Sequence, residues 1–138
     1  MTYRHTITVR YGDCDMQGVV FNSHYLAYAD DAVAHWFRTA LPDGSIWMAD
    51  SQAALFDFMV KKAVVTWSGP AKPYDRLDLD CRVSRWGRTS FDVHVAGSVD
   101  GDERVEILLT YVSVTPGTHT PCTVPEEVRA ALSAGAGR

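Results

Sequence analysis

Hydrophobic and polar residues alternate with two different periods in the first third of the chain. Residues 3–10 alternate with a period of two, which is typical of a strand buried on one face. From residue 23 to about residue 39, apolar residues recur every three or four positions, which predicts a helix with one buried stripe. The stripe consists of Leu26, Ala29, Val33, Trp36 and Phe37. Asn22 or Ser23 is expected to cap this helix at its N-terminus.

Later runs of branched and aromatic residues, mostly in alternation, predict further strands. They cover residues 54–67, 75–86, 89–99 and 103–115. Short links at 87–88 and 100–102 suit hairpins, whereas residues 68–74, with two prolines, predict a longer crossing. The expected fold class is therefore α+β, a five-stranded antiparallel sheet curled round a central long helix.

The remaining segments predict loops and a short terminal helix. Residues 41–52 contain Pro42, Asp43 and Gly44, and a loop is expected there. Residues 125–138 are expected to begin a short helix at Pro125 and to end in a frayed tail. At 138 residues, the chain is expected to form a single domain over 1–138.

Composition narrows the possible functions. A formal net charge of -4 disfavours a nucleic-acid binder, which needs a basic surface. No apolar run approaches the ~20 residues that cross a bilayer, so no membrane contact is expected and the expected location is cytoplasmic. The three cysteines form no CxxC pair and the five histidines show no HxxxH or HxxEH spacing. Neither a disulfide framework nor a metal site is expected.

Candidate chemistry is concentrated just after the first strand, where Asp13, Cys14 and Asp15 follow one another. One interpretation is that both carboxylates are loop residues, one bonding backbone amides in a turn and the other facing water. The other is that one of them is catalytic. Cys14 is a poor candidate nucleophile, because its two aspartate neighbours should raise its pKa and a thiolate needs electropositive surroundings.

The catalytic interpretation depends on the residues that come next. Gly18 permits a close approach of backbone to ligand, and Val19, Val20 and Phe21 supply an apolar wall. The helix that opens at Asn22 offers unpaired N–H groups and the positive end of its dipole, which together stabilise an oxyanion. A carboxylate beside such donors could attack a polarised carbonyl carbon or activate water to do so, which is acyl transfer.

The stretch "YGDCDMQGVVFNSHYLAYAD" (11–30) resembles the motif of the 4-hydroxybenzoyl-CoA thioesterase family of hot-dog-fold proteins. The resemblance continues through "VVTWSGPAKPYDRLDLDCRV" and covers residues 5–115. It implies an acyl-CoA thioesterase without a metal or a bound cofactor, coenzyme A being part of the substrate. It also implies a homo-oligomer, dimer or tetramer, built on a dimer in which two sheets join edge to edge and the sites form between subunits.

The resemblance assigns a role to each matching residue. Asp15 matches the catalytic carboxylate, which acts as a nucleophile or as a general base on water, and Asp13 matches a less critical partner. Gly18 matches the glycine before the helix, and the backbone amide of Asn22 matches the oxyanion donor. Many relatives carry His at the position of Asn22, and the aromatic-acyl type carries Tyr. A catalytic contribution of the side chain is therefore not expected here. His24 is interpreted as structural or surface-exposed.

Further matches concern the two ends of the substrate. Asp30 matches a helix position that reaches the acyl ring's hydroxyl across the subunit boundary in the aromatic branch; the alternative is a solvated acid beside Asp31. In the turn "SRWGRTSF", Arg88 and Ser90 match residues that bind the phosphates of coenzyme A. The positions of Gly87 and Thr89 are basic in the aromatic branch, so phosphate binding should be weaker here or shared with other cations. Those cations are Lys61, Lys62, Lys72 and Arg85.

Weaker phosphate contacts leave an acyl-carrier-protein substrate open, because its pantetheine arm needs fewer of them. A non-hydrolytic acyl-thioester binding module on the same fold is a second alternative. A hot-dog dehydratase or hydratase is a third, but that branch relies on a catalytic His in a different local motif, which this sequence lacks.

Overall fold

The computed structural model describes residues 2–41 and 57–133. Its elements in chain order are β1 (Tyr3–Thr8), η1 (Tyr11–Asp13), α1 (His24–Ala40), β2 (Asp57–Trp67), β3 (Arg76–Trp86), β4 (Ser90–Val99), β5 (Asp102–Val114) and α2 (Glu126–Ser133). None of the helices in these two ranges is long and apolar enough to cross a membrane. Three predicted segments lie wholly or partly outside the described residues: the loop 41–52 except its first residue, the first three residues of the strand 54–67, and the tail at 134–138.

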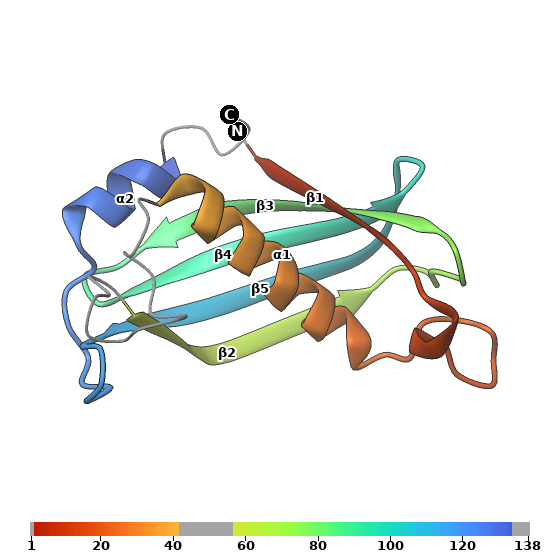
Figure 1. Cartoon of the computed structure of the whole chain (residues 1–138), viewed down its shortest axis with the longest axis horizontal. Coiled ribbons are helices and arrows are strands. Elements are labelled where there is room, and N and C mark those ends of the chain that lie inside the picture. Colours follow the sequence, from red (N-terminus) through yellow and green to blue (C-terminus); the bar gives the residue numbers. More distant parts are fainter. Residues whose placement is uncertain (1, 42–56, 134–138) are drawn as a thin grey trace.

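The five strands form one antiparallel sheet in the order β1-β3-β4-β5-β2. Helix α1 lies across one face of this sheet, and β1 and β2 form its two edges (Figure 1). The chain leaves β2 at one edge and passes β5 and β4 before it enters β3, so the predicted long crossing at 68–74 is confirmed. The predicted five-stranded α+β hot-dog arrangement is also confirmed.

The core forms between α1 and the inward-facing side chains of the sheet. Strand β4 alternates regularly, and its buried residues Phe91, Val93 and Val95 are fully enclosed. The buried side of α1 consists of Tyr25, Ala29, Ala32, Val33, Trp36 and Phe37. The predicted stripe was wrong at Leu26, which is 40% exposed. Leu26 is in the first turn of the helix, where Tyr25 is the residue buried instead.

The predicted side-chain cap of α1 was also wrong. Ser23 occupies the cap position, but its backbone is already helical, with φ -72° and ψ -19°, and its side chain makes no capping hydrogen bond. A cap residue normally has an extended backbone, which aims its side-chain oxygen at the amides of the first turn. Here a tight turn leads into the helix instead, because the His24 N–H donates to the carbonyl of Phe21 at 2.9 Å.

Strand β2 is the less protected edge of the sheet. Val60 is 47% exposed although it pairs with the buried Tyr111, and Trp67 is 51% exposed although it pairs with the buried Val105. Both side chains therefore lie on the inner side of the sheet, at a place that α1 does not cover. An uncovered apolar edge of this kind is a template for pairing with another chain.

Candidate active site

Asp15 lies in a narrow hairpin between Cys14 and Val20, which form an isolated antiparallel bridge. The Gly18 N–H donates to the Asp15 carbonyl at 3.0 Å, and the Gln17 N–H donates to the Asp15 carboxylate at 2.8 Å. Gly18 has φ +77°, and a Cβ atom built there would meet no protein atom within 4 Å. The chain therefore needs glycine here for its backbone conformation rather than for close packing against protein.

Asp13 is committed to holding the hairpin on the helix. Its carboxylate accepts a hydrogen bond from the Tyr28 hydroxyl at 2.8 Å, and its carbonyl accepts from the Phe21 N–H at 3.0 Å. Burial opposes ionisation of this carboxyl, but the Tyr28 hydroxyl, the Arg10 amide and the nearby positive charges outweigh it and lower the pKa of Asp13. Asp13 is thus an ionised residue with a structural role, and it connects the base of the hairpin to α1.

We expect Tyr28→Phe to lower the free energy of unfolding by about 1–2 kcal/mol at pH 7, because it removes a partly buried hydrogen bond to a charged group. Because the pKa of Asp13 is lower in the folded protein, its contribution is complete above the unfolded pKa of about 3.9 and is lost as the pH falls through the folded value. The difference between Tyr28→Phe and wild type in urea unfolding should therefore shrink below about pH 4. A difference that stays constant between pH 7 and pH 3 would contradict this role.

The N-terminus of α1 supplies hydrogen-bond donors beside the hairpin. Among the described residues, the backbone N–H groups of Asn22 and Ser23 have no acceptor. The positive end of the helix dipole lies at the same place and favours an anion there. The absence of a side-chain cap at Ser23 leaves these donors available to a ligand.

A cleft of about 230 Å³ brings the hairpin and the helix terminus together. Its lining residues are Asp15, Gln17, Val19, Val20, Asn22, Tyr25, Trp67, Gly69 and Pro70. The far wall is fixed at Ala71, whose N–H donates to the Tyr25 hydroxyl at 3.0 Å and whose carbonyl accepts from the Val20 N–H at 2.9 Å. Asp15 and Asn22, seven positions apart in the sequence, therefore face one apolar-walled space.

Gly18 and Phe21, which were predicted to belong to the site near Asp15, do not line this cleft. Gly18 lies in the turn outside it, and Phe21 is 45% exposed with its ring edge against His24. Tyr25, which the sequence favours as a helix-core or subunit-contact residue over a catalytic phenol, lines the cleft and is buried. Its hydroxyl is occupied by the Ala71 amide.

Cys14 is poorly suited to be a nucleophile. Burial raises the pKa of its thiol, and the charges of Asp13 and Asp15 raise it further. The predicted direction is confirmed, although burial is the larger cause. Cys14 is also absent from the residues that line the cleft.

Asp30 is an exposed residue of α1 and does not line the cleft. Partial burial of its carboxyl, and then the neighbouring charge of Asp31, raise the pKa of Asp30. Burial, and then Asp30, raise the pKa of Tyr111 on β5, whose buried hydroxyl has no hydrogen-bond partner among the described residues.

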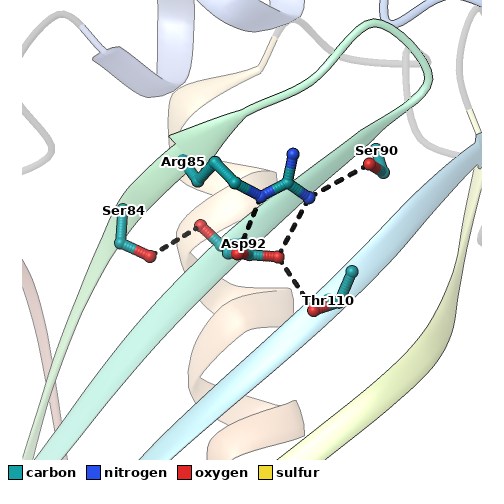
Figure 2. Close-up of polar contacts among 5 residues, drawn as sticks. All are labelled: Ser84, Arg85, Ser90, Asp92 and Thr110. Atoms are coloured by element: carbon teal, nitrogen blue, oxygen red, sulfur yellow. Dashed lines mark hydrogen bonds and ion pairs between the residues drawn. The ribbon is translucent and has the colours of Figure 1, made fainter.

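The predicted phosphate-binding residues lie in the turn between β3 and β4 and at the start of β4, and a polar network on β3, β4 and β5 lies beside them (Figure 2). Arg85 forms a two-pronged ion pair with Asp92 at 2.9 and 3.2 Å and donates to the Ser90 hydroxyl at 3.1 Å. The bond from Arg85 lowers the pKa of Asp92, and Thr110 donates to the same carboxylate at 2.8 Å. Arg85 is thus already neutralised, which makes it a weak candidate for sharing the phosphates.

Arg88 differs from Arg85, because its side chain forms no ion pair with any other described residue. Its backbone is held firmly: the Val124 N–H donates to its carbonyl at 2.9 Å, and Arg129 of α2 donates to the carbonyls of Gly87 and Arg88. Arg129 also lies over the Trp86 ring at 5.3 Å. Helix α2, which sequence reasoning did not connect with the site, thereby fixes the shape of the turn.

The structure does not bring this turn to the cleft within one chain. The cleft includes residues 67–70, before β3 begins, whereas the turn follows the end of β3. Eleven residues of strand at ~3.3 Å per residue separate the two places by about 35 Å. Figure 1 shows the same separation, with the start of α1 at one end of the sheet and the β3–β4 turn at the other. A ligand that contacts both in one site therefore requires two chains.

Sequence reasoning also missed one cluster. His5 of β1 meets Asp31 and His35 of α1, and the ligand atoms of the three side chains lie within 4.8 Å of one another. None of the three lines the cleft. The spacing of Asp31 and His35 places them on one helix face and was readable from the sequence, but the contribution of His5 depends on how β1 packs against α1.

Comparisons with known proteins agree with this fold. The family model of the thioesterase-like superfamily matches residues 9–132. A thioesterase from Thermus thermophilus, solved in complex with coenzyme A and Zn, is similar with a TM-score of 0.80 and 25% identity, over 98% of this chain and 94% of that one. A protein from Pseudomonas aeruginosa gives 0.81 and 25%, over 96% and 90%.

At lower identity the likeness concerns the fold alone. A 1,4-dihydroxy-2-naphthoyl-CoA thioesterase from Synechocystis gives a TM-score of 0.79 and 17% identity, over 96% of both chains. None of the curated proteins compared with the chain matches it.

Proposed function

Since this chain belongs to the thioesterase-like superfamily, we propose that it hydrolyses acyl-CoA thioesters to a free acid and coenzyme A. The observation that carries the proposal is the cleft in which the Asp15 carboxylate and the open N-terminus of α1 face each other. One supplies a base or nucleophile and the other supplies oxyanion donors. The proposed setting is cytoplasmic, and no further cofactor is required.

In the proposed reaction the thioester carbonyl oxygen accepts a hydrogen bond from the Asn22 amide at the helix terminus. Water attacks the carbonyl carbon while Asp15 takes its proton; alternatively, the Asp15 carboxylate attacks directly and water then cleaves the anhydride. The tetrahedral intermediate collapses, the carbon–sulfur bond breaks and the coenzyme A thiolate leaves and is protonated. The bond from the Gln17 amide keeps the Asp15 carboxylate aimed into the cleft, and Gly18 allows that turn to form.

The proposed active unit contains two chains. Strand β2 is an edge with exposed apolar side chains, which favours pairing with β2 of a second copy. If the two β2 strands pair antiparallel, the partner's strand ends at the end of the sheet where this chain's β3–β4 turn lies. The turn of one subunit, with Arg88 and Ser90, then serves the cleft of the other. Tetramers built from such dimers remain compatible with this proposal.

At the acyl end, Phe21 and Asp30 are the proposed substrate contacts. The exposed ring of Phe21 offers apolar surface beside the helix terminus. A carboxyl of Asp30 in contact with the acyl end would favour a polar or aromatic hydroxyl group there over a plain fatty chain. Aliphatic and aromatic acyl groups are therefore both needed in the assay.

Two alternatives remain, and the β3–β4 turn supports the first of them. With Arg85 neutralised by Asp92, Arg88 is left as the unpaired cation of the turn, so an acyl-carrier-protein thioester would fit with few phosphate contacts. A binding module that holds the thioester without cleaving it would use the same cleft. The test is free-thiol release from a panel of aliphatic and aromatic acyl-CoAs by the wild-type protein. Binding without release would favour the module, and release only from carrier-protein thioesters would favour the first alternative.

We expect Arg88→Ala to raise KM for an acyl-CoA about 2- to 5-fold and to leave KM for the matching acyl-pantetheine unchanged, because an exposed cation contributes little more than 1 kcal/mol to a phosphate contact. The measured quantity is the ratio of the two KM values. Arg82→Ala, which removes an exposed cation from the middle of β3, is the matched control and should leave the ratio unaltered. An unchanged ratio in Arg88→Ala would remove Arg88 from the coenzyme site.

A further inference from the structure

Three ligand-type side chains meet where the edge strand β1 packs beside α1. His5 projects from β1, while Asp31 and His35 lie one turn apart on the helix. The His5 Nε2 atom is 3.3 Å from one carboxylate oxygen of Asp31, and the His35 Nε2 atom is 3.6 Å from the other. The two imidazole rings are stacked, with centroids 4.2 Å apart and an interplanar angle of 18°.

These separations are too long for ordinary hydrogen bonds, whose donor and acceptor atoms lie about 2.7–3.2 Å apart. The two separations are closer to the distance between neighbouring ligand atoms of a metal site. In a tetrahedral zinc site with nitrogen and oxygen ligands at ~2.0–2.1 Å, neighbouring ligand atoms are about 3.4 Å apart. Each imidazole nitrogen therefore lies near this spacing from one oxygen of the Asp31 carboxylate, and the three ligand atoms lie within 4.8 Å of one another. The two stacked rings would rotate to direct both nitrogens at one ion.

We propose that His5, Asp31 and His35 form a binding site for a divalent transition-metal ion, with Zn²⁺ as the best-suited ion. Two imidazoles and one carboxylate are a ligand set that binds zinc. The set suits Mg²⁺ and Ca²⁺ poorly, because these ions prefer oxygen ligands. His5 is mostly enclosed, with 19% of its side chain exposed, whereas Asp31 and His35 are more than half exposed. Water can therefore complete the coordination from the solvent side.

The site is separate from the cleft and has a structural consequence. Within the sheet, β1 is hydrogen-bonded on one side only, to β3. A metal ion held by His5 and by two residues of α1 would link this edge strand to the central helix. Because the three ligands come together only in the folded chain, metal binding stabilises that state.

The direct test is calorimetric titration of metal-free protein with ZnCl₂, combined with the visible absorption of the Co²⁺ form. We expect one Zn²⁺ per chain and a Co²⁺ spectrum of the low-coordinate type. His5→Gln, Asp31→Asn and His35→Gln should each weaken Zn²⁺ binding by at least about 10-fold, since each removes one of three ligands. Asp31 and His35 lie on the exposed side of α1, so those two variants keep the fold, which circular dichroism checks.

His94→Gln is the matched control. His94 lies 3.0 Å from Glu106 on the outer face of the sheet and has no third ligand beside it among the described residues. This variant should bind Zn²⁺ like the wild type and show the same rise in Tm when the ion is added, while Asp31→Asn should lose that rise. Equal Zn²⁺ affinity in the wild type and all three ligand variants, or no binding by the wild type, would overturn the proposal.

Discussion

Asp15→Asn is expected to lower kcat for thioester hydrolysis by about 10²- to 10⁴-fold and to leave KM within a few-fold of the wild-type value. Asparagine has the same shape and its side-chain oxygen can still accept the hydrogen bond from the Gln17 amide, so the hairpin should persist. The amide group can neither take a proton from water nor attack a carbonyl carbon. The loss should therefore fall on the chemical step rather than on binding.

Asp75→Asn is the matched control for this prediction. The Asp75 carboxylate, like that of Asp15, accepts a hydrogen bond from a nearby backbone amide, here that of Lys72 at 2.9 Å, but Asp75 does not line the cleft. It should retain the wild-type rate. If both variants lose activity equally, the loss reflects disturbed loops, and if neither does, Asp15 has no role in the chemistry.

Phe37→Ala is expected to lower the free energy of unfolding by about 3–5 kcal/mol, the largest effect on stability that we predict. Phe37 is fully buried and lies at the centre of an aromatic cluster. Its ring centroid is 4.9 Å from that of Phe58 on β2, 5.4 Å from that of Trp36, and 6.2 Å from those of Phe91 and Tyr111. Truncation would leave a cavity in contact with the helix and three strands, which cannot close around it without moving the sheet.

Urea unfolding at one fixed protein concentration measures this loss, because the stability of the proposed dimer would depend on concentration. Phe37→Leu keeps part of the volume and should lose less, which retains a measurable transition if the alanine variant fails to fold. Phe21→Ala makes the same change at a half-exposed position and should cost no more than ~0.5 kcal/mol. Equal losses at Phe21 and Phe37 would contradict this account of the core.

The periodic parts of the fold were predictable because burial imposes a period on the sequence. Strand β4 alternates at every position, and the helix stripe was correct except in its first turn. The cap at Ser23 was not predictable, because it depends on the backbone angles of one residue at the entry to the helix. The exposed side chains of β2 look like core residues in the sequence; only the strand order shows that this strand is an edge.

Some features of the candidate site could also be predicted from the sequence, and others could not. Asp15 and Asn22 are close in sequence, so a hairpin next to a helix could be inferred to bring them together. The ion pair that neutralises Arg85 could not be inferred from the sequence, because it follows from the strand register that places Arg85 opposite Asp92. The distance between the β3–β4 turn and the cleft, and the meeting of His5 with α1, likewise depend on tertiary arrangement alone.

The central claim is that the cleft between Asp15 and the N-terminus of α1 cleaves a bound thioester. Its most direct test is a single-turnover experiment with enzyme in excess over an acyl-CoA, in which the protein-bound material is quenched and analysed by mass spectrometry. We expect the wild type to convert its bound acyl-CoA to free acid and coenzyme A, and Asp15→Asn to retain the intact thioester. Intact acyl-CoA recovered from the wild type, or equally fast cleavage by Asp15→Asn, would contradict the central claim.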